Sequence, residues 1–597
     1  MTPPPISIWA HRLSDLRVTL VKQGLDGVIV PRADEHLGEY VPPAAERLTF
    51  LTGFTGSAGL AAVLPDRAAL FTDGRYVLQL EQQTDATVWE RCHITEIPPP
   101  VWLAQYARAG AHIGYDPLLI SEDSLARYTD AGLSMVAMEA NPVDIIWPER
   151  PAPPTAPALP HALDYAGKAS LEKREEVATA LRAAKQDAAV ITDPASLAWL
   201  LNIRGNDVPF TPFALGFALA HADTRVEIFM DPEKIPPETR AWLGNGVGIA
   251  PRADLAPALA RLTGKTVRVD KAFSPAWFAA TLRAAGATVA DGPDPCALPK
   301  AMKNTVEQQG ARNAHLRDAV AICRFLHFLS EVGPRGSATE LSAAKQLLAF
   351  RQQVKDFRGE SFPAISGAGP NGAIIHYRVT ETSNRPIQPN EVYLIDSGAQ
   401  YPDGTTDITR TVWTGPDPAP QPIRDRVTRV MQGHIALTKL IFPHGVGGAH
   451  IDAFARAALW QAGLDYDHGT GHGVGSFLSV HEGPVSISRA ARPVPIAPGM
   501  ILSNEPGFYL PGQYGVRLEN LLLVQPAALS DAAKPFLQFE TLTLAPFDRD
   551  FLDTALLTRS EIDWLDAYHA RVLSHIAPLL DVATKTWLTA ACAPLVE

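Results

Sequence analysis

A proline-rich stretch, WPERPAPPTAPALP at residues 147–160, divides the N-terminal half of the chain. Proline fixes φ and lacks a backbone N–H, so this stretch cannot continue a helix or a central strand and forms a semi-rigid connector. The same order of patterns occurs on both sides of it: LDGVIV, RLTFLTGFTGSAG and AALFTDGRYVLQL before, and QDAAVIT, SLAWLLNIRGNDV, FALGFALAH and VEIFMD after. Each series predicts a helix, a buried strand, a short helix ending in a glycine turn, and a β-hairpin. The sequence therefore predicts two related α/β domains, at residues 1–160 and 161–298.

A second proline cluster, DGPDPCALPKAMKN at residues 291–304, ends this repeated pattern. Apolar residues then recur at three- and four-residue spacing over residues 305–332, which predicts a long amphipathic helix. Strand-like runs alternate with helices from there on, and LLTRSEIDWLDAYHARVLSHIAPLL predicts a terminal helix with a threonine N-cap. Residues 299–597 are therefore predicted to form an α+β domain with a C-terminal extension.

Charge and composition exclude several classes of protein. The net charge is −12, whereas nucleic-acid and anionic-membrane binding need a cationic surface. The four cysteines form no CxxC pair, and no run of about eighteen apolar residues occurs. The N-terminus also lacks a basic start followed by an apolar core. We therefore expect a soluble cytoplasmic protein with neither nucleic acid nor membrane as a partner.

Two aspartates flank a predicted hairpin in YLIDSGAQYPDGTTDITRT. Asp396 ends an apolar strand, Asp403 and Gly404 form a turn, and Asp407 opens the next strand, so the hairpin brings Asp396 and Asp407 side by side. Two carboxylates held close together need a cation between them, or one must be protonated. Taken alone, the pair is more simply interpreted as turn carboxylates in water.

Three further residues favour metal binding. Glu505 follows an apolar strand in LSNEPGFYL, and Glu519 is predicted to lie inside the almost wholly apolar strand GVRLENLLLV. A carboxylate in such surroundings is costly unless it is paired or bound to a metal. With His472 they complete a set of four carboxylates and one imidazole, whose members are Asp396, Asp407, His472, Glu505 and Glu519. This set suits Mn, Co or Zn in a dinuclear site, and four negative charges balance two divalent ions.

The segment DHGTGHGVGSFLSVHEGP, residues 467–484, combines three histidines with five glycines, which fits neither a helix nor a buried strand. We expect a loop that lines a cleft, in which glycine permits close approach to His472 and unusual φ values.

The ordered series IIHY, IDSGAQYPDGTTDITRT, DHGTGHGVGSFLSVHEGP, SNEPGFY and VRLEN resembles the pita-bread metallopeptidase superfamily, and within it the three-domain Xaa-Pro aminopeptidases. These motifs cover residues 374–520, and the domain arrangement extends the resemblance over essentially the whole chain. The resemblance implies two creatinase-like α/β domains followed by a pita-bread catalytic domain. It also implies an aminopeptidase that hydrolyses the N-terminal Xaa-Pro bond of peptides with a hydroxide held between two metal ions.

The resemblance further implies a role for each donor. Asp396 would bind one metal through both oxygens, and His472 and Glu505 would bind the other. Asp407 and Glu519 would bridge the two ions. Glu505 is our choice for the catalytic group that takes the proton of the nucleophile, and the substrate's α-amino group would lie near the Asp396 metal.

Other residues would contact the substrate. His376 in IIHY, His468 and His481 resemble histidines that face the reacting amide and shape the proline pocket, His376 and His481 as part of the catalytic set. Each of them has a structural role as its alternative. Arg517 fits a role at the far side or carboxyl end of the substrate, and a surface ion pair competes equally with this interpretation.

Two alternative functions remain. One is a prolidase-like dipeptidase, and the other is a non-catalytic pita-bread module that binds peptides or proteins. Members of the latter kind lose the metal ligands, whereas all five positions are filled here. Manganese is the expected metal, with Zn²⁺ and Co²⁺ as alternatives, and the resemblance implies a homodimer.

Overall fold

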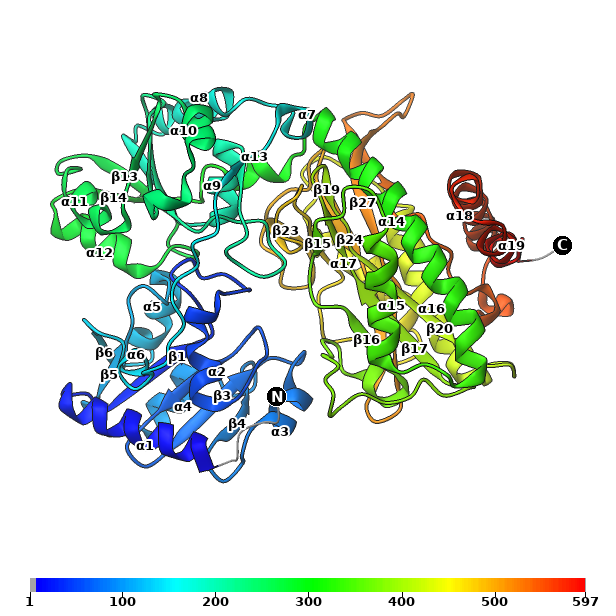
Figure 1. Ribbon diagram of the computed structural model, residues 1–597, viewed down its shortest axis with the longest axis horizontal. Helices are drawn as coiled ribbons and strands as arrows, with labels where there is room; N and C mark the ends of the chain where they lie inside the picture. Colours follow the sequence, from blue (N-terminus) through cyan, green and yellow to red (C-terminus); the bar gives the residue numbers. More distant parts are fainter. Residues whose placement is uncertain (1–6, 596–597) are drawn as a thin grey trace. The chain divides into compact units, whose positions relative to one another are not determined.

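The computed structural model describes residues 7–595 (Figure 1). The chain forms two compact units, of which the first contains Met1–His161 and Lys168–Ala297, and the second contains Ala162–Gly167 and Leu298–Glu597. No helix within residues 7–595 is long and apolar enough to cross a membrane.

The first unit begins with a six-stranded sheet of order β4-β3-β2-β1-β5-β6. Its strands are β1 (Gly27–Pro31), β2 (Leu60–Val63), β3 (Ala68–Thr72), β4 (Glu90–His93), β5 (His112–Tyr115) and β6 (Ser134–Ala137). The surrounding helices are α1 (Ser7–Lys22), α2 (Arg47–Thr52), α3 (Val77–Gln83), α4 (Pro99–Tyr106), α5 (Glu122–Asp130) and α6 (Pro142–Ile145). β1, β2 and β3 pair antiparallel, and β4, β5 and β6 join them in parallel.

A second six-stranded sheet repeats this design, with the order β12-β11-β10-β8-β13-β14. Its strands are β8 (Ala188–Ile191), β10 (Phe217–His221), β11 (Val226–Phe229), β12 (Val247–Ala250), β13 (Thr266–Val269) and β14 (Thr288–Asp291). Its helices are α8 (Ser170–Ala183), α9 (Pro194–Leu201), α10 (Pro237–Leu243), α11 (Leu255–Ala260) and α12 (Ala276–Ala284). Each strand pair has the same sense as its counterpart in the first sheet, so the predicted repeat is confirmed. One detail differs: the residue that follows α2 is the C-cap Gly53, whereas α9 is followed by the C-cap Asn202, and both caps have left-handed backbone conformations.

The second unit is built on a six-stranded sheet of order β21-β28-β27-β24-β22-β23 and a three-stranded sheet of order β16-β17-β20. The strands of the larger sheet are β21 (Ile441–Pro443), β22 (Gly471–Gly473), β23 (Glu482–Ile487), β24 (Ile501–Asn504), β27 (Asn520–Ala527) and β28 (Phe536–Thr541). The smaller sheet contains β16 (Ile365–Ala368), β17 (Val392–Ser397) and β20 (Ile408–Trp413). Short strands complete the unit: β15 (Gly359–Glu360), β18 (Ala399–Tyr401), β19 (Gly404–Thr405), β25 (Gly507–Leu510) and β26 (Tyr514–Arg517).

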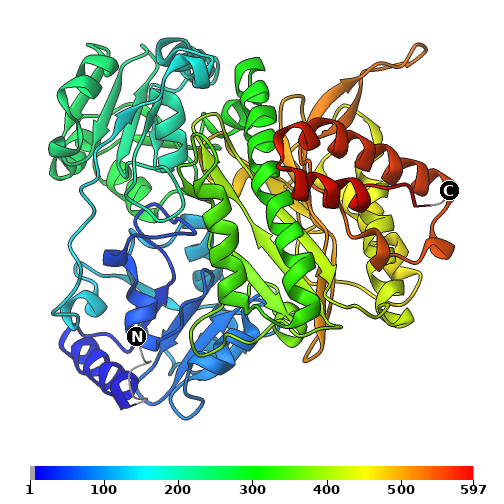
Figure 2. The ribbon, with the colours of Figure 1, turned by 45° about the vertical axis from the view of Figure 1, so that its right-hand side comes forward.

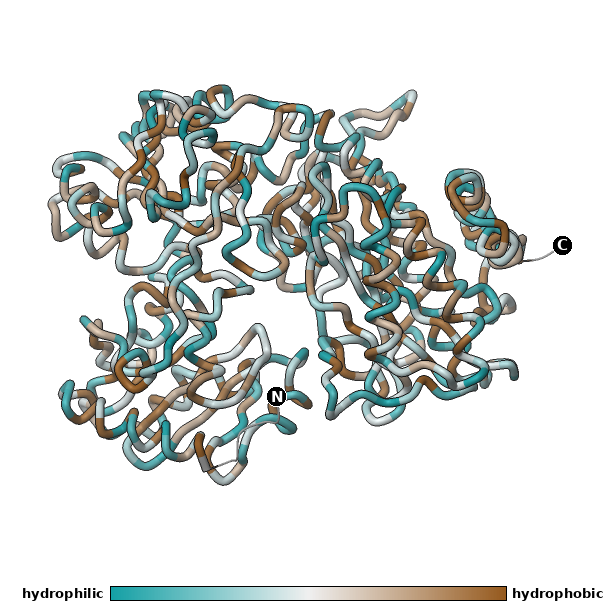
Figure 3. The backbone as a smooth tube through the Cα atoms, viewed as in Figure 1, coloured by the Kyte–Doolittle hydropathy of each residue, from teal (hydrophilic) through white to brown (hydrophobic). Residues whose placement is uncertain are grey.

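Helices cover these sheets. The long helix predicted at residues 305–332 is α14 (Thr305–Val332), and it lies beside α15 (Glu340–Gln352) across the sheets (Figure 2). The other long helices are α16 (Gln421–Thr438), α17 (Gly448–Trp460), α18 (Arg559–Ile576) and α19 (Val582–Ala591). Thr558 caps α18 as predicted. Figure 3 shows hydrophobic residues along the inner strands of each unit, and these strands place the functional side chains described next.

Candidate metal centre

Two paired strands position the first two carboxylates. β17 and β20 are antiparallel, with Asp396 opposite Thr409. Asp407 immediately precedes β20, so the hairpin brings the two aspartates together as predicted. Asp396 is 8% exposed and Asp407 only 3%. Because both side chains are buried, the interpretation as turn carboxylates in water is wrong.

His472 lies in β22, a short strand between β23 and β24 in the larger sheet. The expectation of a cleft-lining loop is therefore wrong at this position. Glycine serves close packing here, since a Cβ at Gly471 would lie 2.0 Å from the Ser503 carbonyl oxygen and one at Gly473 would lie 2.2 Å from that of Glu482. No glycine between residues 469 and 475 has a positive φ, so unusual φ values are not what the glycines supply. The absence of a side chain at Gly471 and Gly473, rather than the backbone freedom of glycine, allows this strand to lie inside the sheet.

The two glutamates follow strand ends. Glu505 comes directly after β24, and its carboxylate Oε1 accepts a hydrogen bond from Ser503 Oγ at 3.1 Å. Glu519 lies in the junction between β26 and β27, which corrects the prediction that it lies inside one strand. Its backbone N–H donates to the Thr409 carbonyl, and its Oε2 accepts from Thr409 Oγ1 at 2.7 Å. The strand is interrupted between β26 and β27, and at this point Glu519 contacts the smaller sheet that carries the two aspartates.

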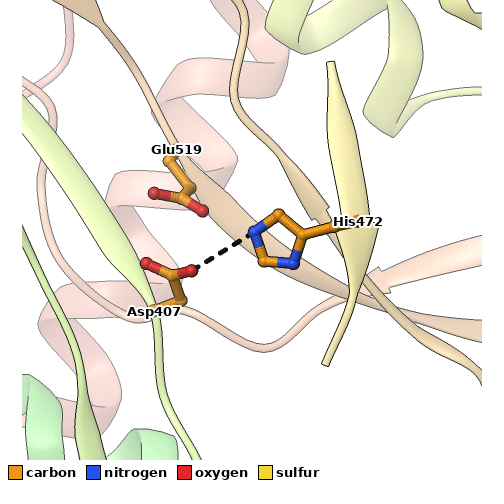
Figure 4. Close-up of side chains that lie close together, drawn as sticks. All are labelled: Asp407, His472 and Glu519. Carbon is orange, nitrogen blue, oxygen red and sulfur yellow. Dashed lines mark ion pairs between the residues drawn. The ribbon is translucent and has the colours of Figure 1, made fainter. Parts of the chain in front are cut away.

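These strands bring four of the donors into close contact. Asp407, His472 and Glu519 each offer one ligand atom, and the three atoms lie within 4.8 Å of one another (Figure 4). His472 Nε2 is 3.5 Å from Asp407 Oδ2 and 3.3 Å from Glu505 Oε1. Asp396 joins this group electrostatically, because its charge acts on both Glu505 and Glu519.

The protein alone does not satisfy these carboxylates. Among the described residues, Asp396 Oδ1, Asp407 Oδ1 and Glu519 Oε1 are buried without a hydrogen-bond partner. Burial, followed by the charges of Asp407 and Glu505, raises the pKa of Glu519 well above its usual range. Burial likewise raises the pKa of Glu505 to about 7 despite the opposing charge of His472. Orphaned carboxylate oxygens beside one imidazole are the donor set for two divalent cations, so the residues fit a dinuclear centre.

The three predicted substrate-facing histidines differ in how the structure relates them to this centre. The exposed His481 lies edge-on to His472, with ring centroids 4.3 Å apart. The half-buried His468 lies 2.9 Å from the Tyr509 hydroxyl through its Nε2. His376, also half-buried, follows the turn Gly369–Ala373, which packs against β26. His481 thus contacts a candidate donor directly, whereas His468 is connected to Arg517 through the Tyr509 hydroxyl.

Arg517 forms an ion pair, but not at the surface. The residue is 2% exposed, and its Nη2 is 2.6 Å from Asp396 Oδ2. Its Nη1 donates to the Tyr509 hydroxyl at 2.6 Å. The surface ion pair considered above is therefore replaced by a buried one that holds Asp396.

Comparisons with known proteins agree with this geometry. Residues 309–526 match the Metallopeptidase family M24, residues 535–595 its C-terminal region, and residues 12–144 and 149–307 two families of Creatinase/Prolidase N-terminal domains. The "Probable Xaa-Pro aminopeptidase P" of Sordaria macrospora is 37% identical over 98% of this chain and 99% of its own. The chain belongs to the Xaa-Pro aminopeptidase P family. Aminopeptidase P2 of Arabidopsis thaliana is also 37% identical, over 96% of this chain and 86% of its own.

A crystal structure of a further family member shares the fold. The X-prolyl aminopeptidase from Caenorhabditis elegans, described as a cytosolic enzyme with a di-nuclear active site, superposes with a TM-score of 0.93 at 33% identity. The match covers 98% of this chain and 99% of that one. The predicted fold, two creatinase-like domains and a pita-bread domain, is confirmed.

Two polar residues of this Xaa-Pro aminopeptidase P family member were missed in the sequence. Thr409 links Glu519 to Arg517, whose Nε lies 3.3 Å from the Thr409 hydroxyl. Thr409 follows Asp407 by two residues, and residues two apart in an extended chain face the same side. This spacing was therefore a usable signal for Thr409 in the sequence. Tyr509 contacts His468 and Arg517. No local pattern distinguishes it from a core tyrosine, since its partners are remote in sequence.

Proposed function

We propose that this chain is a two-metal aminopeptidase that releases the N-terminal residue from peptides with proline in the second position. The carrying observation is the cluster of buried, unsatisfied carboxylate oxygens at Asp396, Asp407 and Glu519 beside His472. Membership in the Xaa-Pro aminopeptidase P family supplies the substrate class. The filled donor set favours catalysis over the non-catalytic binding module, and the two preceding domains favour this family over a prolidase-like dipeptidase.

Five side chains are assigned to the metals. Asp396 would hold one ion, His472 and Glu505 would hold the other, and Asp407 and Glu519 would contribute to both. The orphaned oxygens of Asp396, Asp407 and Glu519 support this assignment. When bound, two divalent ions supply a water of near-neutral pKa and polarise the scissile carbonyl. Manganese is our proposed metal, because an oxygen-rich set with one imidazole accepts it well.

The remaining groups act on protons and on the substrate. Glu505 would accept the proton of the attacking water. His481 and His376 would hydrogen-bond the reacting amide, and His468 would shape the proline pocket. Arg517 orients Asp396 through their 2.6 Å ion pair, and a contact from its guanidinium to the substrate's far end remains part of the proposal.

Proline at the second position makes the scissile bond a tertiary amide with no N–H. A site for this bond needs no acceptor for an amide proton, and it needs room for the pyrrolidine ring. A free α-amino group near the Asp396 metal would restrict cleavage to the N-terminus, because only the first residue of a peptide carries one.

Three wider features complete the proposal. The domain boundaries are placed at residues 1–160, 161–298 and 299–597. We place the protein in the cytoplasm, as described for the C. elegans relative. We also propose a homodimer joined largely through the third domain. Light scattering coupled to size-exclusion chromatography measures the mass of the assembly and so tests whether it is a dimer.

Metal counting by plasma emission spectrometry tests the centre. We expect two ions per chain in the wild type and fewer in Asp407→Asn. Asp563→Asn, which alters an exposed ion pair on α18, is the matched control and should keep two. Glu505→Ala should lose turnover while remaining folded. A wild-type chain that binds no divalent ion, or a Glu505→Ala variant of undiminished activity, would contradict the proposal.

A further inference from the structure

A buried cluster of two lysines and one glutamate lies outside the donor set. Lys300, Lys303 and Glu482 are each 4% exposed. Lys300 Nζ is 2.9 Å from Glu482 Oε2, and Lys303 Nζ is 2.5 Å from Oε1. Buried charges are stable only when paired in good geometry, and here both carboxylate oxygens are used. The two lysines lower the pKa of Glu482, against the effect of burial. Glu482 is therefore held at two points rather than one.

The lysine side of the cluster is anchored independently of Glu482. Lys300 belongs to α13 (Ala297–Ala301). Ala301 of this helix packs in an apolar cluster with Val485 and Leu502 of the larger sheet. The Lys303 backbone N–H donates to the Gly499 carbonyl at 3.0 Å. The ammonium groups thus project from a frame that is fixed to the sheet, and Glu482 is the element they position.

Glu482 adjoins the histidines of the metal centre. It is the first residue of β23 and directly follows His481. The Glu482 side chain contacts the two lysines, whereas the ring of its neighbour His481 lies against the ring of His472. Glu482 also pairs with Gly473, the residue after His472, and the backbones approach so closely that a Cβ at Gly473 would meet the Glu482 carbonyl. A shift of Glu482 therefore moves His481 relative to His472.

We propose that Lys300 and Lys303 act through Glu482 as positioning residues that fix His481 against His472 for the reaction. None of the three is a metal donor in the assignment above. The role rests on the proposed function, because it presupposes that His481 contacts the reacting amide. It goes beyond the donor set by assigning a function to Lys300 and Lys303, which lie where the chain enters the second unit for its long segment Leu298–Glu597.

Glu482→Asp is the main test, because it keeps the charge of the cluster but shortens the reach of the carboxylate by one methylene. We expect kcat on a Xaa-Pro-Pro tripeptide to fall about 10- to 100-fold, since small misplacements of a catalytic group have effects of this order. KM and the count of two Mn²⁺ per chain should stay near the wild-type values. Glu540→Asp, in the ion pair of Arg312 with β28, is the matched control and should leave kcat unchanged.

Lys300→Met is the second variant, for the case that Glu482→Asp does not fold. It leaves a one-to-one pair of Lys303 with Glu482, so no carboxylate is stranded in the interior. We expect a fall in kcat of about 10-fold with unchanged KM, by the same loss of positioning.

A double-mutant cycle separates positioning from a purely structural role. If Glu482 acts through His481, Glu482→Asp should have no further effect on kcat in a His481→Ala background. Wild-type kcat in both Glu482→Asp and Lys300→Met, or full additivity with His481→Ala, overturns the positioning role. Failure of the proposed function is distinct, since the wild-type chain with Mn²⁺ would then release no residue at all.

Discussion

Replacing Glu505 with glutamine should stabilise the metal-free protein at alkaline pH. Its carboxyl pKa rises from the usual 4.5 to about 7 on folding, mainly by burial. A carboxyl group whose pKa is higher in the folded than in the unfolded chain binds its proton more tightly when folded. Its stabilising contribution is therefore complete below pH 4.5 and is lost as the pH rises through about 7.

The pKa shift sets the size of the effect. A rise from 4.5 to about 7 corresponds to about 3 kcal/mol of destabilisation once Glu505 is ionised. Glutamine has nearly the same shape and stays neutral, so it avoids this cost. The charge of His472 is already included in this shift, because it opposes the rise. We expect a net stabilisation of about 3 kcal/mol at pH 8.5 and almost none at pH 4.5.

Differential scanning calorimetry in chelator measures this. The relevant transition is the one that Mn²⁺ shifts in the wild type, which identifies the unit that carries the site. The expected gain of about 3 kcal/mol corresponds to a rise of about 5 °C in its midpoint at pH 8.5, since a unit of about 300 residues unfolds with an entropy of about 0.6 kcal/mol/K. With Mn²⁺ present, the wild type should become the more stable protein, because the variant lacks one donor. A variant that is less stable than the wild type in chelator at pH 8.5 would refute this reasoning.

Three further predictions concern the same centre. Gly471→Ala places a Cβ 2.0 Å from the Ser503 carbonyl oxygen and should cost about 1 to 3 kcal/mol of unfolding free energy, measured by urea denaturation; unchanged stability would show that the sheet yields there. Thr409→Val removes the 2.7 Å hydrogen bond to Glu519 and should weaken Mn²⁺ binding about 10- to 100-fold by calorimetric titration, and wild-type affinity would contradict a supporting role. The rise in melting temperature produced by Mn²⁺ should be larger at pH 8 than at pH 5, because protons compete with metal for the carboxylates and His472, and an equal rise at both values would argue against these donors.

The repeated α/β design was predictable from the sequence because it depends on local patterns, and strand and helix periodicity recurs on either side of the proline-rich stretch. Local patterns also selected three of the candidate donors, since Asp396, Glu505 and Glu519 each stand next to an apolar run. The environment of His472 was not predictable in the same way. Glycines at positions 471 and 473 favour a loop when only the sequence is considered. They lie in a strand instead, and the adjacent strands approach so closely that there is no room for a Cβ at either position.

Contacts between distant segments were likewise beyond the sequence. Glu519 lies between two strands because β26 pairs with β25 while β27 joins the larger sheet, a division that the continuous apolar run conceals. The buried pair of Arg517 with Asp396 joins residues 121 positions apart. Such partners become visible only when the register of the strands is known.

The most direct test of the central claim is the initial rate of hydrolysis of Arg-Pro-Pro beside Arg-Ala-Ala, with chelator-stripped protein before and after addition of Mn²⁺. We predict release of arginine from the proline peptide only, and only with metal present. Folded protein that releases no arginine with Mn²⁺, Zn²⁺ or Co²⁺, or that cleaves both peptides equally without metal, would contradict a two-metal Xaa-Pro aminopeptidase.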